Sequence, residues 1–276
     1  MSKTQPSDVD RTARPDVEFT TAPARSVRRA TLYAMTYSPW SEKARWALDH
    51  HRVPYEYKLY TPMLGEPLLR LRALRSRTWP KRVTVPALLA EGSIHLDSLQ
   101  IALYAERNGS NFNLFRDTTA VTRWNDLSER ALQAARILST ARALADREAQ
   151  VEFLPPFITG ALRPKMTWLA RFGAHYLERK YRFDASKLDA ARATYREALL
   201  ALRQGLADAG APYLVAHRLS YADMTMAVTL QFVVPVSDDF IRIGPLQRRT
   251  LTDPELAVEF ADLVAWRDDL YQKHRR

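Results

Sequence analysis

Ser38 lies in the segment whose residue types and spacing most directly offer chemistry. The apolar run Leu32-Tyr33-Ala34-Met35 predicts a short strand, and Ser38-Pro39 behind it is a favourable start for a helix. Apolar residues then recur at helical spacing over residues 39–51. A hydroxyl at such a junction sits at a helix N-terminus, where free N–H groups and the helix dipole stabilise an anion. Ser38 is therefore either an anion-activating group or only a helix cap.

The composition excludes several kinds of chemistry. The chain has no cysteine, so its own side chains cannot form disulfides, thiolate metal sites or a catalytic thiol. Its six histidines show no metal-ligand spacing, and we expect no metal. Its eight glycines form no G-x-G, and there is no G-x-S-x-G elbow. Dinucleotide-binding, P-loop and α/β-hydrolase functions therefore find no support.

The charge balance is basic, with a formal net charge of +10. Most arginines are interleaved with acidic residues, which usually indicates a solvated surface, so we expect no nucleic-acid partner. No apolar run approaches the roughly 20 residues of a membrane span, since the longest, 226–236, is shorter and contains Gln231. The basic N-terminus lacks the apolar region of a signal peptide. We expect a cytoplasmic protein that does not enter membranes, in agreement with the missing cysteine.

The elements around Ser38 predict an α/β unit. Residues 53–60 alternate like a second strand, parallel to the first because a helix connects the two. Residues 61–82 are irregular or a short helix. Residues 83–90 form a third strand, which Glu91-Gly92 turns back into a fourth at 93–96, and Asp97-Ser98 then caps a helix ending near Gly109. This element order is the thioredoxin-like layout.

The rest of the chain is predicted to be helical. Long helices cover 118–149 and 186–208, and the last begins near Pro254. Another begins at Ser220, with Asp223 completing a capping box and Leu219 and Met224 in staple positions. The Pro- and aromatic-rich stretch 151–185 reads as a loop plus a shorter helix. We predict four parts. A flexible tail covers 1–29, and an α/β thioredoxin-like N-terminal domain covers 30–110. A linker over 111–117 leads to an all-α helical C-terminal domain over 118–276.

The order and spacing of four short motifs resemble those of the cytosolic glutathione transferase superfamily, over about residues 30–272. The motifs are Ser38-Pro39, Val85-Pro86, Asp97-Ser98 and the helix start at 219–223. Ser38 is similar to the serine of the theta, zeta and tau-like classes or a bacterial relative. The resemblance implies a homodimeric detoxification enzyme that activates the thiol of glutathione, its co-substrate, for attack on a small apolar electrophile. A non-catalytic binding or interaction protein on the same fold is the alternative, because a fold does not guarantee activity.

The resemblance also assigns glutathione-binding residues. Val85-Pro86 is similar to the family's cis-proline, whose bend lets the backbone of Val85 pair with the cysteinyl part of glutathione. Ser98 and the N–H groups of its helix would hold the γ-glutamyl carboxylate, and Asp97 would face the amino group. Simple helix capping is the alternative for both, and it is compatible with binding.

The glycine carboxylate of glutathione would lie near the segment before the third strand. Lys81 or Arg82 would meet it, with Arg72 as a further candidate. The sequence departs here from the family's usual Lys-Val-Pro, since Thr84 precedes Val85-Pro86. The choice among the basic residues stays open, and each of them is otherwise part of a solvated surface.

Within the family pattern, Ser38 aligns with the first cysteine of a Cys-Pro-x-Cys redox motif, here Ser38-Pro39-Trp40-Ser41. Hydroxyls replace both thiols, so the reacting sulfur must come from the ligand. A free thiol has a pKa of roughly 8.5, and a hydroxyl that donates to the sulfur at a helix N-terminus favours the thiolate. Tyr37 is the main rival for this role and Ser41 a third candidate. Aromatic residues suggest an apolar acceptor site: Trp124, Phe153, Phe157 and Trp168.

Overall fold

The structure is a computed structural model that describes residues 30–60, 65–73, 84–146, 148, 185–215 and 217–275. The expected flexible tail over 1–29 lies outside these residues. So does the loop with a shorter helix expected over 151–185, except for Ala185.

Four strands form one sheet in the α/β part of the chain, in the order β2-β1-β3-β4. Their bounds are Ala30–Ala34 for β1, Tyr55–Leu59 for β2, Ala87–Ala90 for β3 and Ser93–His95 for β4. β1 pairs in parallel with β2 and antiparallel with β3. β3 and β4 form the predicted hairpin, where Glu91 and Gly92 have φ values of 51° and 77°. Two consecutive residues at positive φ are what a tight hairpin turn needs.

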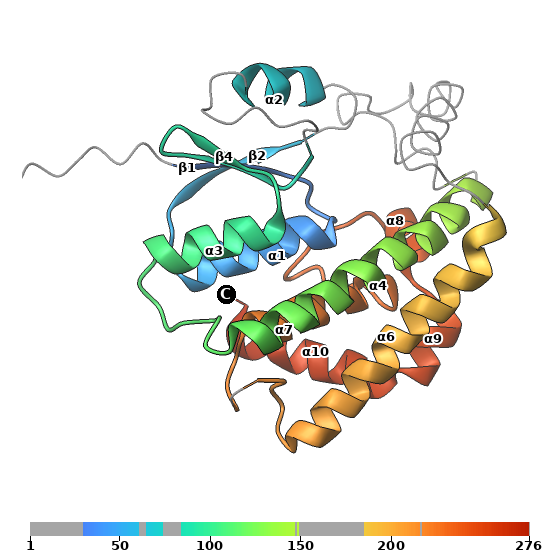
Figure 1. The fold of residues 1–276 in the computed structure, drawn as a ribbon. Coiled ribbons are helices and arrows are strands. Elements are labelled where there is room, and N and C mark those ends of the chain that lie inside the picture. Colours follow the sequence, from blue (N-terminus) through green and yellow to red (C-terminus); the bar gives the residue numbers. More distant parts are fainter. Residues whose placement is uncertain are drawn as a thin grey trace, which may run out of the picture.

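Helices cover both faces of this sheet. α1 (Pro39–His50) and α3 (Ser98–Asn108) lie together on one face, and α2 (Gly65–Ala73) lies on the other (Figure 1). Successive side chains of β1 point to opposite faces of the sheet, as they do in any strand. Leu32 belongs to the large core that includes α1 and α3, whereas Tyr33 packs with Leu69 of α2. The predicted thioredoxin-like fold of this part is confirmed.

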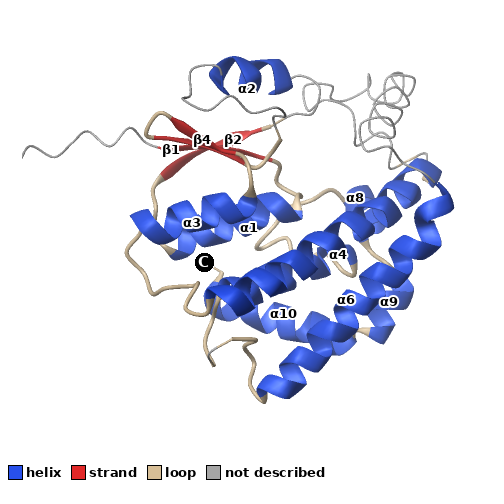
Figure 2. Cartoon of the chain, in the orientation of Figure 1, coloured by secondary structure: helices blue, strands red, loops and turns tan. Residues whose placement is uncertain are grey.

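The remainder of the described chain is helical (Figure 2). Its helices are α4 (Thr118–Ala145), α6 (Leu188–Ala209), α7 (Tyr221–Thr229), α8 (Pro245–Leu251), α9 (Pro254–Glu259) and α10 (Ala261–His274), with the short 3-10 turns η4 (Ala185–Lys187) and η5 (Leu230–Phe232). Every residue of α7 is buried. α4 and α10 pack around it, and the predicted helical C-terminal part is confirmed (Figure 1).

Two features of this part differ from the prediction. α8 was not expected, and the last helix is divided at Phe260, which has φ −116° and ψ 30°. The carbonyl of Glu259 accepts a hydrogen bond from the guanidinium of Arg203 at 2.7 Å, and Phe260 itself is fully buried under that guanidinium. A side chain of α6 thus satisfies the carbonyl at the break, which the spacing of apolar residues in the sequence could not indicate.

The capping box at the start of α7 is present as predicted. The Ser220 hydroxyl donates to Oδ2 of Asp223 at 2.6 Å, and the Ser220 N–H donates to the same oxygen at 2.8 Å. The N–H of Leu214 donates to Oδ1 at 2.7 Å. Burial raises the pKa of the Asp223 carboxyl to about 6, although these hydrogen bonds oppose the rise. Asp223 therefore fixes both α7 and the chain before it.

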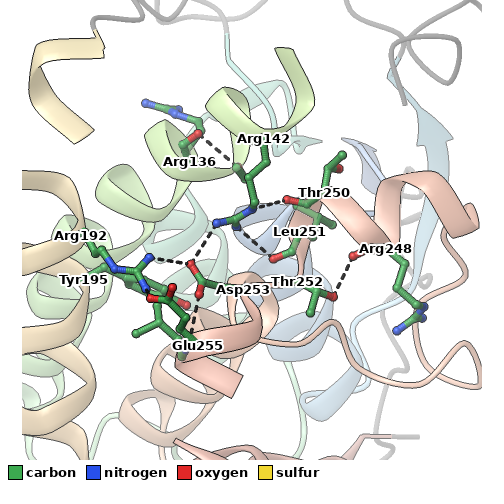
Figure 3. Close-up of polar contacts among 12 residues, drawn as sticks. Arg136, Arg142, Arg192, Tyr195, Arg248, Thr250, Leu251, Thr252, Asp253 and Glu255 are labelled. Atoms are coloured by element: carbon green, nitrogen blue, oxygen red, sulfur yellow. Dashed lines mark hydrogen bonds and ion pairs between the residues drawn. The ribbon is translucent and has the colours of Figure 1, made fainter. Parts of the chain in front are cut away.

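Arginine side chains join the helices at the far end of α4 (Figure 3). Arg142 donates to the carbonyl of Thr250 at 2.8 Å and to Oδ2 of Asp253 at 3.0 Å, and Arg192 reaches the same oxygen at 3.1 Å. Asp253 in turn caps α9 by accepting from the N–H of Leu256. These guanidinium groups bind structural partners, so part of the basic charge serves packing rather than a solvated surface.

The two parts of the chain share one core. The ring of Trp46 in α1 lies 4.5 Å from that of Tyr271 in α10, and Phe115 stacks on Tyr221 of α7 at 5.1 Å between ring centres. All four side chains belong to the same buried cluster. α1 is therefore held from both the sheet and the helical part, which matters for the residues at its N-terminus.

Candidate functional site

The three motifs singled out in the sequence lie at one end of the sheet. Tyr33 pairs with Ala87, so the end of β1 lies beside the start of β3. Leu88 pairs with His95, which brings the end of β4 to the same place. The chain enters α1, leaves the Val85-Pro86 bend and enters α3 at these three strand ends. The sheet thus gathers two helix N-termini and the bend between them.

Ser38 is the N-cap of α1, with extended dihedral angles of φ −77° and ψ 123°. Its hydroxyl accepts a long hydrogen bond of 3.5 Å from the N–H of Ser41, and its carbonyl accepts from the N–H of Glu42 at 3.0 Å. The side chain is buried, and among the residues that the structure describes no acceptor takes its hydroxyl proton. The predicted cap is confirmed.

The two rivals of Ser38 lie close by. Ser41 is fully buried, and its hydroxyl oxygen accepts the N–H of Met35 at 3.2 Å, which ties the end of β1 to α1. This contact gives Ser41 a structural task away from solvent. Tyr37 is half-buried in the turn between β1 and α1. Tyr37 therefore stays the main rival of Ser38 for activation of the sulfur, ahead of Ser41.

The Val85-Pro86 peptide bond is cis, as expected from the resemblance. Pro86 is buried, whereas Val85 is half-buried. The hydroxyl of Thr84 donates to the carbonyl of Leu96 at 3.2 Å. This bond joins the bend directly to the residue before Asp97, so the two predicted glutathione-binding motifs lie side by side.

Asp97 and Ser98 begin α3, as predicted, but their side chains point to different surroundings. Asp97 is exposed and caps the helix by accepting from the N–H groups of Leu99 at 2.7 Å and Gln100 at 3.4 Å. Ser98 is buried beside Tyr221 of α7. Burial raises the pKa of the Tyr221 phenol, and the neighbouring Ser98 hydroxyl opposes that rise. Ser98 therefore also belongs to the contact between the two parts of the chain.

The predicted contacts to the glycine carboxylate are only partly described. Lys81 and Arg82 lie outside the described residues. Arg72 belongs to α2, where its guanidinium lies over the ring of Tyr33 at 5.2 Å from the ring centre. Stacking of this kind is a common structural role for arginine.

Of the four predicted acceptor residues, three lie outside the described residues: Phe153, Phe157 and Trp168. Trp124 is buried in α4 against Gly205 of α6, where an added Cβ would come within 2.5 Å of its ring. Gly205 is thus required for the close approach of the two helices. Trp124 thus has a packing role between α4 and α6, and its contact with an acceptor stays a prediction.

The structure adds a residue that the sequence did not indicate. Glu129 of α4 accepts the indole N–H of Trp40 at 2.7 Å and the ammonium of Lys43 at 2.7 Å. Burial lowers the pKa of Lys43, while the charges of Glu129 and Asp97 raise it. The sequence shows only that Trp40 and Lys43 are three residues apart on a predicted helix. Their partner lies more than 80 residues away and left no local signal.

Two functional classes can be tested directly on the described residues. No group of histidine, cysteine or acidic side chains within them could hold a metal ion. Their helices also include none whose length and apolar character would suit a membrane crossing.

Comparison with known proteins agrees with this geometry. Residues 32–111 match the family model described as glutathione S-transferase, N-terminal domain. Among curated proteins, none matches the sequence significantly.

Solved structures share the fold at low sequence identity. A glutathione S-transferase from Methylobacterium radiotolerans in complex with glutathione sulfonate is 16% identical, with a TM-score of 0.56, over 88% of this chain and 90% of that one. One from Methylobacillus flagellatus with glutathione bound is 16% identical, with a TM-score of 0.55, over 89% and 96%. The glutathione-bound homologue YqjG from Escherichia coli is 17% identical, with a TM-score of 0.55, over 89% and 74%.

Proposed function

From the premise that this chain carries a glutathione S-transferase N-terminal domain and has the fold of the cytosolic glutathione transferase superfamily, we propose that it binds glutathione and transfers its sulfur to a small apolar electrophile. The observation that carries the proposal is the convergence of Ser38, the cis Val85-Pro86 bend and the Asp97-Ser98 helix start at one end of the sheet. Solved relatives with this fold hold glutathione or its derivatives.

In this proposal the Ser38 hydroxyl donates a hydrogen bond to the glutathione sulfur. The N-terminus of α1 adds the favourable field of its free N–H groups. Both interactions favour the thiolate over the thiol, so they lower the pKa of the thiol from roughly 8.5 toward neutrality. The thiolate then forms a carbon–sulfur bond with the electrophile, which either releases a leaving group or accepts the electron pair and a proton.

The peptide part of glutathione is assigned to the remaining motifs. The backbone of Val85 would pair with the cysteinyl residue, Ser98 and the start of α3 would hold the γ-glutamyl carboxylate, and Asp97 would face the amino group. Lys81 or Arg82 would meet the glycine carboxylate. The acceptor would lie against Trp124 of α4 and the aromatic stretch that holds Phe153, Phe157 and Trp168.

A non-catalytic binding protein on the same fold is the second candidate. It is favoured by the structural tasks that the motif residues already perform, since Asp97 caps α3 and the Ser98 hydroxyl lies beside Tyr221. A protein of this kind would keep these residues for folding alone.

Two measurements separate these functions. Retention on immobilised glutathione, with elution by free glutathione, tests binding. A conjugation assay with an activated chloronitrobenzene then tests transfer. Binding with turnover supports the transferase. Binding without turnover toward several electrophiles, or no binding at all, contradicts it and supports the second candidate.

We also propose a division of the chain into domains. A glutathione-binding domain over 30–110 is joined by the linker 111–117 to a helical domain over 118–276. We expect a cytoplasmic homodimer, because most soluble oligomers are two-fold dimers and the family pairs in this way. A monomer mass from light scattering at micromolar concentration would contradict the dimer.

A further inference from the structure

α1 carries two charged side chains at adjacent positions that are both fully buried, Glu42 and Lys43. A buried charge is costly unless it is paired and hydrogen-bonded. Glu42 pairs with Arg275, and Lys43 pairs with Glu129 of α4. The partners come from the helical part of the chain, so the position of α1 depends on them.

Glu129 contacts α1 through both of its carboxylate oxygens. Oε2 accepts the indole N–H of Trp40 at 2.7 Å, and Oε1 accepts the ammonium of Lys43 at 2.7 Å. Residues three apart share one face of a helix, so one carboxylate meets two donors on the same face. Two directed bonds to a single group fix both the position and the rotation of the first turn of α1 relative to α4.

This first turn is the one that holds Ser38. Trp40 follows Ser38 by two residues, and the N–H of Glu42 donates to the Ser38 carbonyl at 3.0 Å. The ammonium of Lys43 also interacts electrostatically with Asp97, the N-cap of α3. The Glu129 carboxylate is therefore connected to both helix N-termini of the candidate site.

We propose that Glu129 is a positioning residue for the sulfur site. By holding Trp40 and Lys43, it sets where the Ser38 hydroxyl and the free N–H groups of α1 lie relative to the bound sulfur. The position of a catalytic group relative to the reacting atom must be fixed, because a displacement of about 1 Å can lower the rate about 100-fold. The inference rests on the proposed function, because the sulfur in question is that of glutathione.

The test is Glu129→Gln in the full chain. The amide keeps the size of the side chain but loses its charge, and its NH₂ group faces one of the two donors. We expect kcat to fall about tenfold or more while KM for glutathione changes less than about threefold, since the interaction acts on the reacting sulfur. The ultraviolet signal of the bound thiolate should titrate at higher pH. Trp40→Phe, which replaces the indole by a phenyl ring and so removes the N–H that Glu129 accepts, should shift the titration in the same direction.

Glu259→Gln is the matched control. Glu259 accepts from Arg196 at 2.8 and 3.0 Å between α9 and α6, so the same chemical change removes one charge from another helix–helix pair. It should leave kcat and the thiolate titration unchanged. Circular dichroism and thermal melting verify that each variant is folded.

The outcomes separate the inference from the function on which it rests. If Glu129→Gln folds and titrates like the wild type, the positioning role is overturned while the proposed function stands. A rise in KM with unchanged kcat would also overturn it, by placing Glu129 in binding alone. If Glu129→Gln does not fold, Trp40→Phe decides by the same titration. If the wild type gives no thiolate signal with glutathione, the proposed function and the inference fail together.

Discussion

The guanidinium of Arg275 donates from Nε to Oε1 of Glu42 at 2.7 Å, and thereby joins the end of the helical part to the first turn of α1. The same guanidinium donates to Asp49 at 2.7 Å. Burial opposes the charge on Arg275, but the two carboxylates outweigh it and raise its pKa above the usual range. Arg275 is thus a buried cation that pairs with two carboxylates of α1.

Replacement of Arg275 by alanine should lower the free energy of unfolding by about 3 kcal/mol, because it leaves Glu42 buried without its main partner. Denaturant unfolding monitored by circular dichroism measures the loss. Lys273→Ala is the control, since Lys273 pairs with Asp269 on an exposed surface and its replacement should change the free energy of unfolding much less. Equal effects of the two variants would mean that the buried pair contributes no more than a surface pair.

Ser38→Ala should reduce turnover with glutathione by about 100-fold and weaken glutathione binding much less, because the hydroxyl acts mainly on the reacting sulfur. The ultraviolet thiolate signal should titrate at higher pH in the variant. Tyr37→Phe is the control and should leave the titration nearly unchanged. The opposite pattern would assign the protein to the tyrosine classes. If neither variant shifts the titration, Ser38 is only a helix cap.

Ser98→Ala should weaken glutathione binding by about 1–2 kcal/mol, the magnitude of a lost hydrogen bond to a charged group. Calorimetric titration measures the change. Because Ser98 lies beside Tyr221, the control is Tyr221→Phe, which alters the same contact from the helical side. A loss of stability in both variants with unchanged affinity would restrict Ser98 to the contact between the two parts.

The contribution of Asp223 to stability should depend on pH. Burial raises its pKa in the folded protein to about 6, whereas the ordinary pKa of an exposed aspartate is 3.8. Between these values the unfolded chain binds fewer protons than the folded one, so this group's contribution to stability falls as pH rises. The free energy of unfolding of the wild type, relative to Asp223→Asn, should therefore decrease by about 2 kcal/mol from pH 4 to pH 7.

Denaturant unfolding of both proteins at several pH values measures this difference, since other titrating groups cancel in the comparison. An increase with pH would show that the hydrogen bonds from Ser220 and Leu214 outweigh burial and hold the carboxylate charged.

The sequence by itself determined the features that depend on neighbouring residues. The Ser38 cap, the Glu91-Gly92 hairpin and the Ser220–Asp223 capping box each follow from side chains within a few residues of the backbone that they stabilise. Their order along the chain was sufficient for the thioredoxin-like layout and for the helical part behind it. Sequence therefore also located the three motifs that meet at one end of the sheet.

Only the tertiary structure decided what surrounds those motifs. Charged residues at adjacent positions of α1 resemble a solvated surface in the sequence, yet Glu42 and Lys43 are fully buried. Their partners, Arg275 and Glu129, come from distant helices, and such pairing leaves no periodicity in a single sequence. Trp124 likewise packs against Gly205 of another helix, a contact that the sequence did not indicate. Local chemistry fixes caps and turns, whereas the burial of a charge or a ring depends on which distant segment folds over it.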